Sequence, residues 1–369
     1  MKKVLFLTYS PAPYRVAFFE ELGKYCELEV IYEMESNDVS NRNQNWFINE
    51  AHNFSVVKTK RIKLKQYVIC SNIISILKNG NYDEIIMGTY SSLTAMLAIT
   101  YMKLKNIPFW LNSDGGFIKE KENVVKRAVK THFISAASYY LASGKHTKKY
   151  LEYYGAEKNT VYIYPFSSYL KSDFPDSLIT ESERKQIRND IGISEKYVVL
   201  SVGQFIFRKG FDVLIKAASQ LKTTVGIYIV GDTPTEEYLK LCKEYNVTNV
   251  HFIGYKSKNE LIEYYKAADL FVCPTREDIW GLVINEALTF GLPVITTARC
   301  GAGLELIKNG YNGEIIPCED YNSLAEAIDL FFEDWGNIEQ LRNNAFESVG
   351  NYNIENEAFV HAKLMGLLN

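Results

Sequence analysis

The chain has 369 residues, of which 47% are hydrophobic and 23% are charged, and its formal net charge is −3. This length exceeds one typical domain and is enough for two hydrophobic cores, so we expect two lobes. The small excess of acid argues against nucleic acid as a principal partner, because domains that bind nucleic acid are usually strongly basic.

The first half of the chain alternates strand-like and helix-like segments. Strands are predicted at 3–8, 28–32, 54–57, 84–88 and 109–111. The proline-marked loop at 10–13 leads into a helix with Val16, Phe19 and Leu22 on one side. Such alternation is typical of an α/β fold with a parallel sheet.

The uncharged run 85–102 approaches the length of a bilayer span. Gly88, Thr89, Ser91 and Ser92 interrupt it where a loop and a helix N-cap belong. We therefore predict a strand followed by a helix and not a transmembrane segment.

Two features of this half bear on function. The loop at 112–116, NSDGG, follows a strand at the carboxyl edge of the sheet, so Asp114 is a candidate site residue, with a plain turn as the alternative. The segment 119–150 predicts a basic amphipathic helix. Its apolar residues, which are expected to face a core, are Val124, Val125, Ala128, Val129 and 132–134, and its outward bases are Lys121, Lys126, Arg127 and Lys130. A solvated face is the simpler interpretation; with the basic run 58–65, contact with an anionic membrane surface is the second one.

The run 162–183 is rich in proline and serine and predicts the linker between the lobes. Strands at 197–203, 224–231, 249–253 and 269–273 predict a second Rossmann-like lobe, and the tail from 337 to 369 is helical in pattern. We expect an N-terminal lobe at 1–170, onto which a helix at about 353–369 packs back, and a C-terminal lobe at 171–352.

The stretch 268–317 concentrates the polar residues of the second lobe. A buried strand at 270–273 leads through a loop at 276–280 to a helix at 281–290, so Asp278 and Glu286 flank the start of that helix. The unpaired amides of Leu282 and Val283 in its first turn favour an anion such as phosphate. Taken alone, a loop with two acidic residues is common in α/β proteins.

A second loop carries cations. Residues 202–210, VGQFIFRKG, here called the lysine loop, follow the first strand of the second lobe, and Arg208 and Lys209 suit phosphate oxygens. The order of residues excludes a Walker loop, and the G-x-G-x-x-G dinucleotide fingerprint is absent from the first turn of both lobes.

Four blocks in order resemble the retaining glycosyltransferases of family 4. They are the lysine loop, IVGD at 229–232, the run from Gly254 to Glu277, and DIWGLVINEALTFGLPVITT at 278–297. The resemblance covers essentially the whole chain. It implies the GT-B fold, in which two Rossmann-like lobes enclose a nucleotide-sugar cleft, with UDP- or GDP-linked donors and no metal.

The resemblance also implies roles for single residues. Glu286 holds the ribose hydroxyls of the donor, and Gly281 with the Leu282 and Val283 amides lies near the diphosphate, which Lys209 neutralises. Gly203 and Tyr255 of the matching blocks are further donor-binding candidates.

This chain departs from the family pattern at three places. Asp278 stands where relatives have a glutamate that contacts the donor sugar, and Glu277 beside it is the competing candidate. Gln204 replaces a common arginine, whose charge Arg208 is expected to supply. Asp114 stands where many relatives carry a histidine, and the usual glycine-rich first loop is replaced by SPAPYR, so Arg15 is expected near the donor phosphates or an acceptor.

The sequence thus predicts a retaining, metal-independent transferase that moves a sugar to a glycan or lipid-linked oligosaccharide, as in surface polysaccharide synthesis. No D-x-D metal motif occurs, and fixed cations suffice to stabilise a leaving diphosphate. The five histidines lack metal-ligand spacing, and the six cysteines, which form no C-x-x-C pair, are expected to be buried thiols. A strand pattern directly after residue 3 indicates a cytoplasmic protein without a signal peptide, peripheral at the inner membrane face if the basic helix binds lipid. The alternatives are a nucleotide-sugar epimerase of the same fold and a non-catalytic sugar-binding protein.

Overall fold

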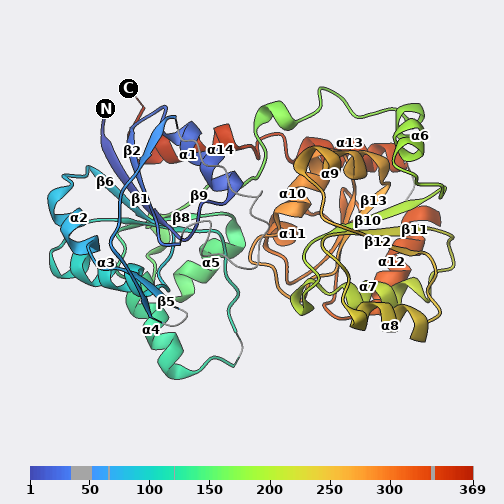
Figure 1. Cartoon of the computed structure of the whole chain (residues 1–369), viewed down its shortest axis with the longest axis horizontal. Coiled ribbons are helices and arrows are strands. Elements are labelled where there is room, and N and C mark those ends of the chain that lie inside the picture. The colour runs from blue at the N-terminus through green and yellow to red at the C-terminus, as the bar shows by residue number, and fades with distance from the viewer. Residues whose placement is uncertain (35–51, 65–66, 120, 334–336, 369) are drawn as a thin grey trace. The chain divides into compact units, whose positions relative to one another are not determined.

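The structure is a computed structural model that describes residues 1–34, 52–64, 67–119, 121–333 and 337–368. Its contacts separate two compact units, Met1–Lys171 with Tyr352–Asn369, and Ser172–Asn351. The sequence places these divisions after residues 170 and 352. Each unit is described by itself below (Figure 1).

The first unit is built on a parallel sheet of seven strands in the order β3-β2-β1-β6-β7-β8-β9. The strands are β1 (Lys3–Thr8), β2 (Glu27–Tyr32), β3 (Phe54–Val56), β6 (Glu84–Met87), β7 (Trp110–Ser113), β8 (Tyr139–Ala142) and β9 (Val161–Ile163). A separate antiparallel pair, β4 (Arg61–Leu64) and β5 (Tyr67–Cys70), occupies part of the basic run and was not foreseen from the sequence.

Helices cover this sheet, and its apolar strands pack against them. They are α1 (Pro13–Leu22), α2 (Ile73–Asn79), α3 (Leu93–Leu104), α4 (Val124–Ile134), α5 (Lys145–Tyr153) and α14 (Ile354–Leu364). The first and last of these pack side by side, so the C-terminal end of the chain returns to its N-terminal unit (Figure 1). The run 85–102 falls on β6 and α3, and Ser92 caps the first turn of that helix. The predicted strand and helix are therefore confirmed.

Three predictions for the first half are wrong. Val124, Val125 and Val129 of α4 are 80%, 70% and 41% exposed, so they do not face a core, whereas Phe133 and Ile134 at the end of the helix do. Lys130 is not a free outward base, because it pairs with Glu122 at 2.6 Å. The strand after Pro108 begins at Trp110 and includes Asn112 and Ser113, so the loop starts at Asp114.

The run predicted as a linker is only partly one. Its aromatic side chains Tyr164, Phe166 and Tyr169 are buried, between 0% and 4% exposed, and belong to the first unit. Periodicity does not reveal such burial, because these side chains pack singly between prolines and serines and form no repeating pattern.

The second unit has a parallel sheet of six strands in the order β12-β11-β10-β13-β14-β15. The strands are β10 (Val198–Val202), β11 (Gly226–Val230), β12 (Val250–Ile253), β13 (Leu270–Cys273), β14 (Val294–Thr297) and β15 (Gly313–Ile316). This is the Rossmann order, in which the chain reverses direction across the sheet between β10 and β13.

Eight α-helices among the described residues belong to this unit, and they enclose a core that includes Val199, Ile227 and Leu214. They are α6 (Glu181–Asp190), α7 (Phe211–Ala218), α8 (Glu236–Glu244), α9 (Lys258–Ala267), α10 (Leu282–Thr289), α11 (Gly301–Leu306), α12 (Tyr321–Glu333) and α13 (Ile338–Ser348). The helical tail therefore divides: α13 packs on α10, and only α14 joins the first unit.

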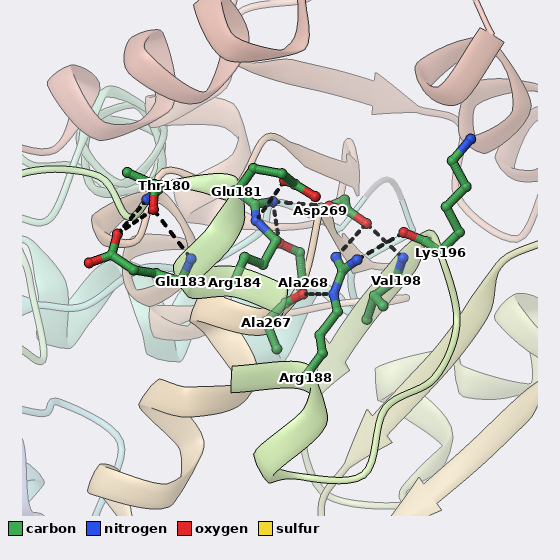
Figure 2. Close-up of polar contacts among 10 residues, drawn as sticks. All are labelled: Thr180, Glu181, Glu183, Arg184, Arg188, Lys196, Val198, Ala267, Ala268 and Asp269. Carbon is green, nitrogen blue, oxygen red and sulfur yellow. Dashed lines mark hydrogen bonds and ion pairs between the residues drawn. The ribbon is translucent and has the colours of Figure 1, made fainter. Parts of the chain in front are cut away.

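Buried arginines fasten α6 to the amino-terminal edge of this sheet (Figure 2). The Arg188 guanidinium donates to Asp269 and to the carbonyls of Ala267 and Lys196, each at 2.8 Å. Arg184 donates to the other oxygen of Asp269 at 3.0 Å. Since Asp269 also accepts from the Val198 amide at the start of β10, the cluster fixes the first residue of that strand.

Candidate active site

The lysine loop and the loop that carries Asp278 meet at one edge of the second unit. β10 pairs directly with β13, with Val199 opposite Leu270, and both strands run in the same direction. The loops that follow them therefore leave the sheet side by side at its carboxyl edge. This is the point where the strand order reverses, which is where open α/β sheets bind ligands.

A carboxylate and two cations come together there. The Lys209 ammonium lies 2.5 Å from an Asp278 carboxylate oxygen, and both side chains are largely buried, at 12% and 13% exposed. The Arg208 guanidinium lies 3.4 Å from the same oxygen and is 46% exposed. The edge thus has one buried ion pair and one cation that faces solvent.

Backbone contacts hold these two loops together. The Thr275 hydroxyl and the Arg276 amide both donate to the Arg208 carbonyl, at 2.7 and 2.8 Å. Gly210 ends the lysine loop with φ of +71°, and a Cβ there would lie 2.1 Å from the Pro274 carbonyl oxygen. Only glycine fits this close approach, so the positions of Lys209 and Asp278 are fixed relative to one another.

The Arg276 side chain is a second clamp on the lysine loop. Its guanidinium donates to both oxygens of Asp212, at 2.8 and 2.7 Å, and to the Phe207 carbonyl at 2.7 Å. It also donates to Glu319 at 2.6 Å and lies 3.9 Å from the centre of the Phe207 ring. Hydrogen bonds to the Asp212 and Glu319 carboxylates raise the pKa of this guanidinium well above its ordinary value.

Sequence reasoning missed Arg276. Its principal partner, Asp212, is 64 residues away in the chain, and a single base in a polar loop gives no signal of its own. The sequence did indicate that Arg276 lies near the site, because it stands two residues before Asp278 in the same loop.

The start of α10 has the geometry expected of an anion site. Gly281 precedes the helix with φ of +97°, and a Cβ there would lie 2.5 Å from the Cys300 sulfur, so no other residue fits. Leu282 and Val283 form the first turn, where helix amides lack intrahelical partners. The helix dipole adds positive potential at this end.

The two remaining acidic candidates have partners of their own. Glu277 forms an ion pair with Arg299, so it is turned to a different cation from that of Asp278. Glu286 lies in the second turn of α10, partly exposed, and accepts a hydrogen bond from the Tyr265 hydroxyl at 2.9 Å.

Gly203 and Tyr255 also lie at the carboxyl edge of this sheet. Gly203 directly follows β10 and packs beside the Lys209 side chain, which a Cβ would approach to 3.4 Å. Tyr255 follows β12 and is 50% exposed. The donor-binding role of Tyr255 stays a prediction.

Asp114 and Arg15 form a second polar group, within the first unit. Asp114 directly follows β7, and its carboxylate contacts the Arg15 guanidinium and the Tyr164 hydroxyl, the latter at 3.0 Å. Arg15 is buried, with 4% of its surface exposed. The structure thus brings these two candidates together, and contact of Arg15 with a donor or acceptor stays a prediction.

Across the described ranges of the chain, no group of three or more histidine, cysteine, aspartate or glutamate side chains is arranged to hold a metal ion. None of the helices that the structure describes is long and apolar enough to cross a membrane.

Comparison with known proteins identifies this unit. The family described as glycosyl transferases group 1 matches residues 183–348, which lie wholly within the second unit. The second unit is a group 1 glycosyltransferase domain. The predicted resemblance to glycosyltransferases is therefore confirmed for this unit, while the activity of the whole protein and the narrower assignment to family 4 stay predictions.

Relatives extend the glycosyltransferase match. An uncharacterised glycosyltransferase of Methanocaldococcus jannaschii is 30% identical over 47% of this chain and 46% of its own length. The Campylobacter jejuni N,N'-diacetylbacillosaminyl-diphospho-undecaprenol α-1,3-N-acetylgalactosaminyltransferase is 24% identical over 78% of each chain. The match thus spans about half the length of the Methanocaldococcus relative and 78% of the length of the Campylobacter relative.

A solved structure supports the fold of the whole chain. Anabaena HepE, crystallised in complex with UDP, matches with a TM-score of 0.79 over 99% of this chain and 100% of that chain, at 18% identity. The predicted GT-B fold, with a Rossmann-like sheet in each unit, is confirmed.

Proposed function

We propose that this protein is a retaining, metal-independent glycosyltransferase, which moves a sugar from a UDP- or GDP-sugar to a hydroxyl of a glycan or lipid-linked oligosaccharide. The observation that carries this proposal is the juxtaposition of Lys209, Arg208 and Asp278 at the switch point of a group 1 glycosyltransferase domain. Cations fixed beside a helix start suit a diphosphate, and a neighbouring carboxylate suits sugar hydroxyls.

The proposed donor site divides these roles. The first-turn amides of α10 and the Lys209 ammonium bind the diphosphate, and Glu286 accepts hydrogen bonds from the ribose hydroxyls. An ammonium has three donors, so Lys209 holds Asp278 and a phosphate oxygen at the same time. Asp278 lies beside Lys209, the proposed ligand of the diphosphate, whereas Glu277 pairs with Arg299, so Asp278 is the carboxylate proposed to contact the donor sugar.

In the proposed reaction, the bond between the anomeric carbon and the phosphate oxygen breaks while the acceptor oxygen bonds to that carbon on the same face. Negative charge grows on the leaving diphosphate, where Lys209, Arg208 and the α10 amides stabilise it. The acceptor proton passes to an oxygen of the leaving phosphate, so the step needs neither a metal nor a protein nucleophile.

The acceptor is proposed to be lipid-linked. The Campylobacter relative carries an undecaprenol diphosphate in its name, and α4 exposes Val124 and Val125 beside the bases Lys126 and Arg127. A helix that exposes apolar residues among bases suits an anionic membrane surface. Charge reversal at Lys126 and Arg127 is expected to reduce sedimentation with phosphatidylglycerol vesicles, and unchanged sedimentation would exclude this surface.

The test of the function is incubation of purified protein with UDP- and GDP-sugars, with and without an isoprenyl-diphosphate-linked glycan, in the presence of a chelator. A product heavier by one sugar, formed only with acceptor, supports the proposal. An epimerised donor without acceptor would make the protein an isomerase, and binding of free sugar without nucleotide would make it a sugar-binding protein.

A further inference from the structure

A charged cluster lies in the interior of the first unit, directly behind Asp114. Its centre is Arg15 of α1, whose guanidinium contacts Asp114 through Nη2 and lies 3.7 Å from a Glu357 oxygen through Nη1. Arg15 and Glu357 are 4% and 1% exposed. A single buried guanidinium therefore faces two carboxyl groups from different parts of the chain.

Glu357 reaches this cluster from the first turn of α14. One of its oxygens accepts a hydrogen bond from the Ser167 amide at 3.3 Å, and the other makes no hydrogen bond within the described part of the chain. Burial raises the pKa of Glu357 to about 8, although Arg15 acts to lower it. When Glu357 is neutral, Arg15 does not form an ion pair with it, and its positive charge is balanced by the Asp114 carboxylate.

His361, one turn further along α14, reaches the same loop. Its Nε2 lies 2.8 Å from the side-chain oxygen of Asn112, and its Nδ1 lies 2.8 Å from the Glu357 carbonyl oxygen. The Asn112 amide in turn donates to the Tyr164 hydroxyl at 3.1 Å and to Asp114 at 3.3 Å. Burial lowers the pKa of His361 to about 3, and a neutral ring donates a hydrogen bond through only one of these two nitrogens.

We propose that Glu357 and His361 of the C-terminal helix are positioning residues, which act through Arg15 and Asn112 to hold the Asp114 carboxylate at the carboxyl edge of the first sheet. This proposal deepens the proposed function, since it rests on a role for Asp114 in transfer. It assigns to the returning helix α14 a part in the site as well as in packing against α1.

The interaction between Arg15 and Asp114 is expected to depend on whether Glu357 is protonated. The charged or titratable groups that face Glu357 are Arg15 from α1, Asp114 after β7, Tyr164 after β9 and His361 on its own helix. When Glu357 loses its proton, it competes with Asp114 for the one guanidinium. The folded pKa of Glu357 is raised, so its neutral form is held below about pH 8 and lost above it.

The first experiment needs no substrate. The carboxyl carbons of glutamate are labelled with carbon-13 and titrated by NMR in the wild type, Asp114→Asn and Glu355→Gln; Glu357→Gln identifies the resonance. Glu355 is the matched control, because it lies on the same helix but binds the Lys171 amide. We expect Glu357 to titrate near pH 8 in the wild type and control and at lower pH in Asp114→Asn, which frees Arg15. An ordinary pKa, or one that Asp114→Asn does not move, would overturn the proposal.

The second experiment measures turnover against pH with an accepted donor. Deprotonation of a group with a pKa near 8 changes its neutral fraction about tenfold between pH 7 and 9, so wild-type kcat is expected to fall about that much and Glu357→Gln to remain level. Glu355→Gln should follow the wild type, with donor KM unchanged in all three. Identical profiles for Glu357→Gln and the wild type would refute the positioning role. If no nucleotide sugar is turned over, the proposed function fails, and the NMR titration still decides whether Glu357 is coupled to Asp114.

Discussion

Replacement of Arg276 by alanine tests whether this residue fixes the position of the lysine loop, even without contact to the donor. The substitution removes both bonds to Asp212, the bond to the Phe207 carbonyl and the stacking on the Phe207 ring. Arg276 and Asp212 are 14% and 24% exposed, so the pair is only partly screened by water. Hydrogen bonds to charged groups contribute about 1.5–3 kcal/mol, and we expect a loss of about 2–3 kcal/mol in the free energy of unfolding.

The loss of this clamp should also weaken donor binding. The Arg276 side chain anchors Phe207 to the Asp278 loop, and the Thr275 hydroxyl and the Arg276 amide anchor Arg208, so Arg276→Ala keeps the contacts to Arg208 and loses the one to Phe207. A misplacement of about 1 Å can slow an enzymatic reaction about 100-fold; the contacts to Arg208 remain, and we expect a smaller effect on affinity, about tenfold weaker binding of a UDP-sugar.

The assays are denaturant unfolding and calorimetric titration with UDP-sugar. Glu319→Gln is the control, since it disturbs only the contact of Arg276 with a 59% exposed side chain and should change neither quantity appreciably. A variant Arg276→Ala that loses stability but binds donor as the wild type does would refute the positioning argument.

Three further predictions concern the same unit. Lys209→Ala and Glu286→Ala should each lose donor affinity or turnover substantially, by about 100-fold if the lost interaction is worth about 3 kcal/mol, as checked by calorimetry and kcat/KM; wild-type values in both would remove these residues from the site. Gly281→Ala should lower stability by at least about 1–3 kcal/mol, because its Cβ would lie 2.5 Å from the Cys300 sulfur at positive φ, and an unchanged melting temperature would contradict this geometry. Arg188→Ala should lower the free energy of unfolding by about 3–5 kcal/mol, since it leaves Asp269 and two carbonyls short of a buried donor, whereas a cost below about 1 kcal/mol would mean that water replaces the guanidinium.

Much of the fold was predictable because its strands are continuous apolar runs between polar loops. The segments at 270–273 and 281–290 are a strand and a helix almost to the residue. The first half of α4 defeated the same reasoning, because helical spacing shows that Val124, Val125 and Val129 share a region of the helix but not what covers it.

The candidate residues of the site that belong to local sequence motifs could be predicted. Asp278 and Lys209 were predicted from loops that follow two strands, and Glu286 from the helix after one of those loops; the structure places Asp278 beside Lys209. The contacts that hold such residues were not predicted, because their partners are distant in sequence: Arg15 is 99 residues from Asp114, and Asn112 is 249 residues from His361. No local pattern of a single sequence records pairs of this kind.

The central claim is that Asp278, held beside Lys209, takes part in transfer of a sugar from a nucleotide. Its most direct test is the turnover of wild type and Asp278→Asn with a nucleotide sugar and a lipid-linked acceptor, followed by mass spectrometry of the acceptor. We predict a product heavier by one sugar with the wild type, and about 100-fold slower transfer by Asp278→Asn with donor affinity nearly unchanged. Transfer by Asp278→Asn at the wild-type rate would contradict the account.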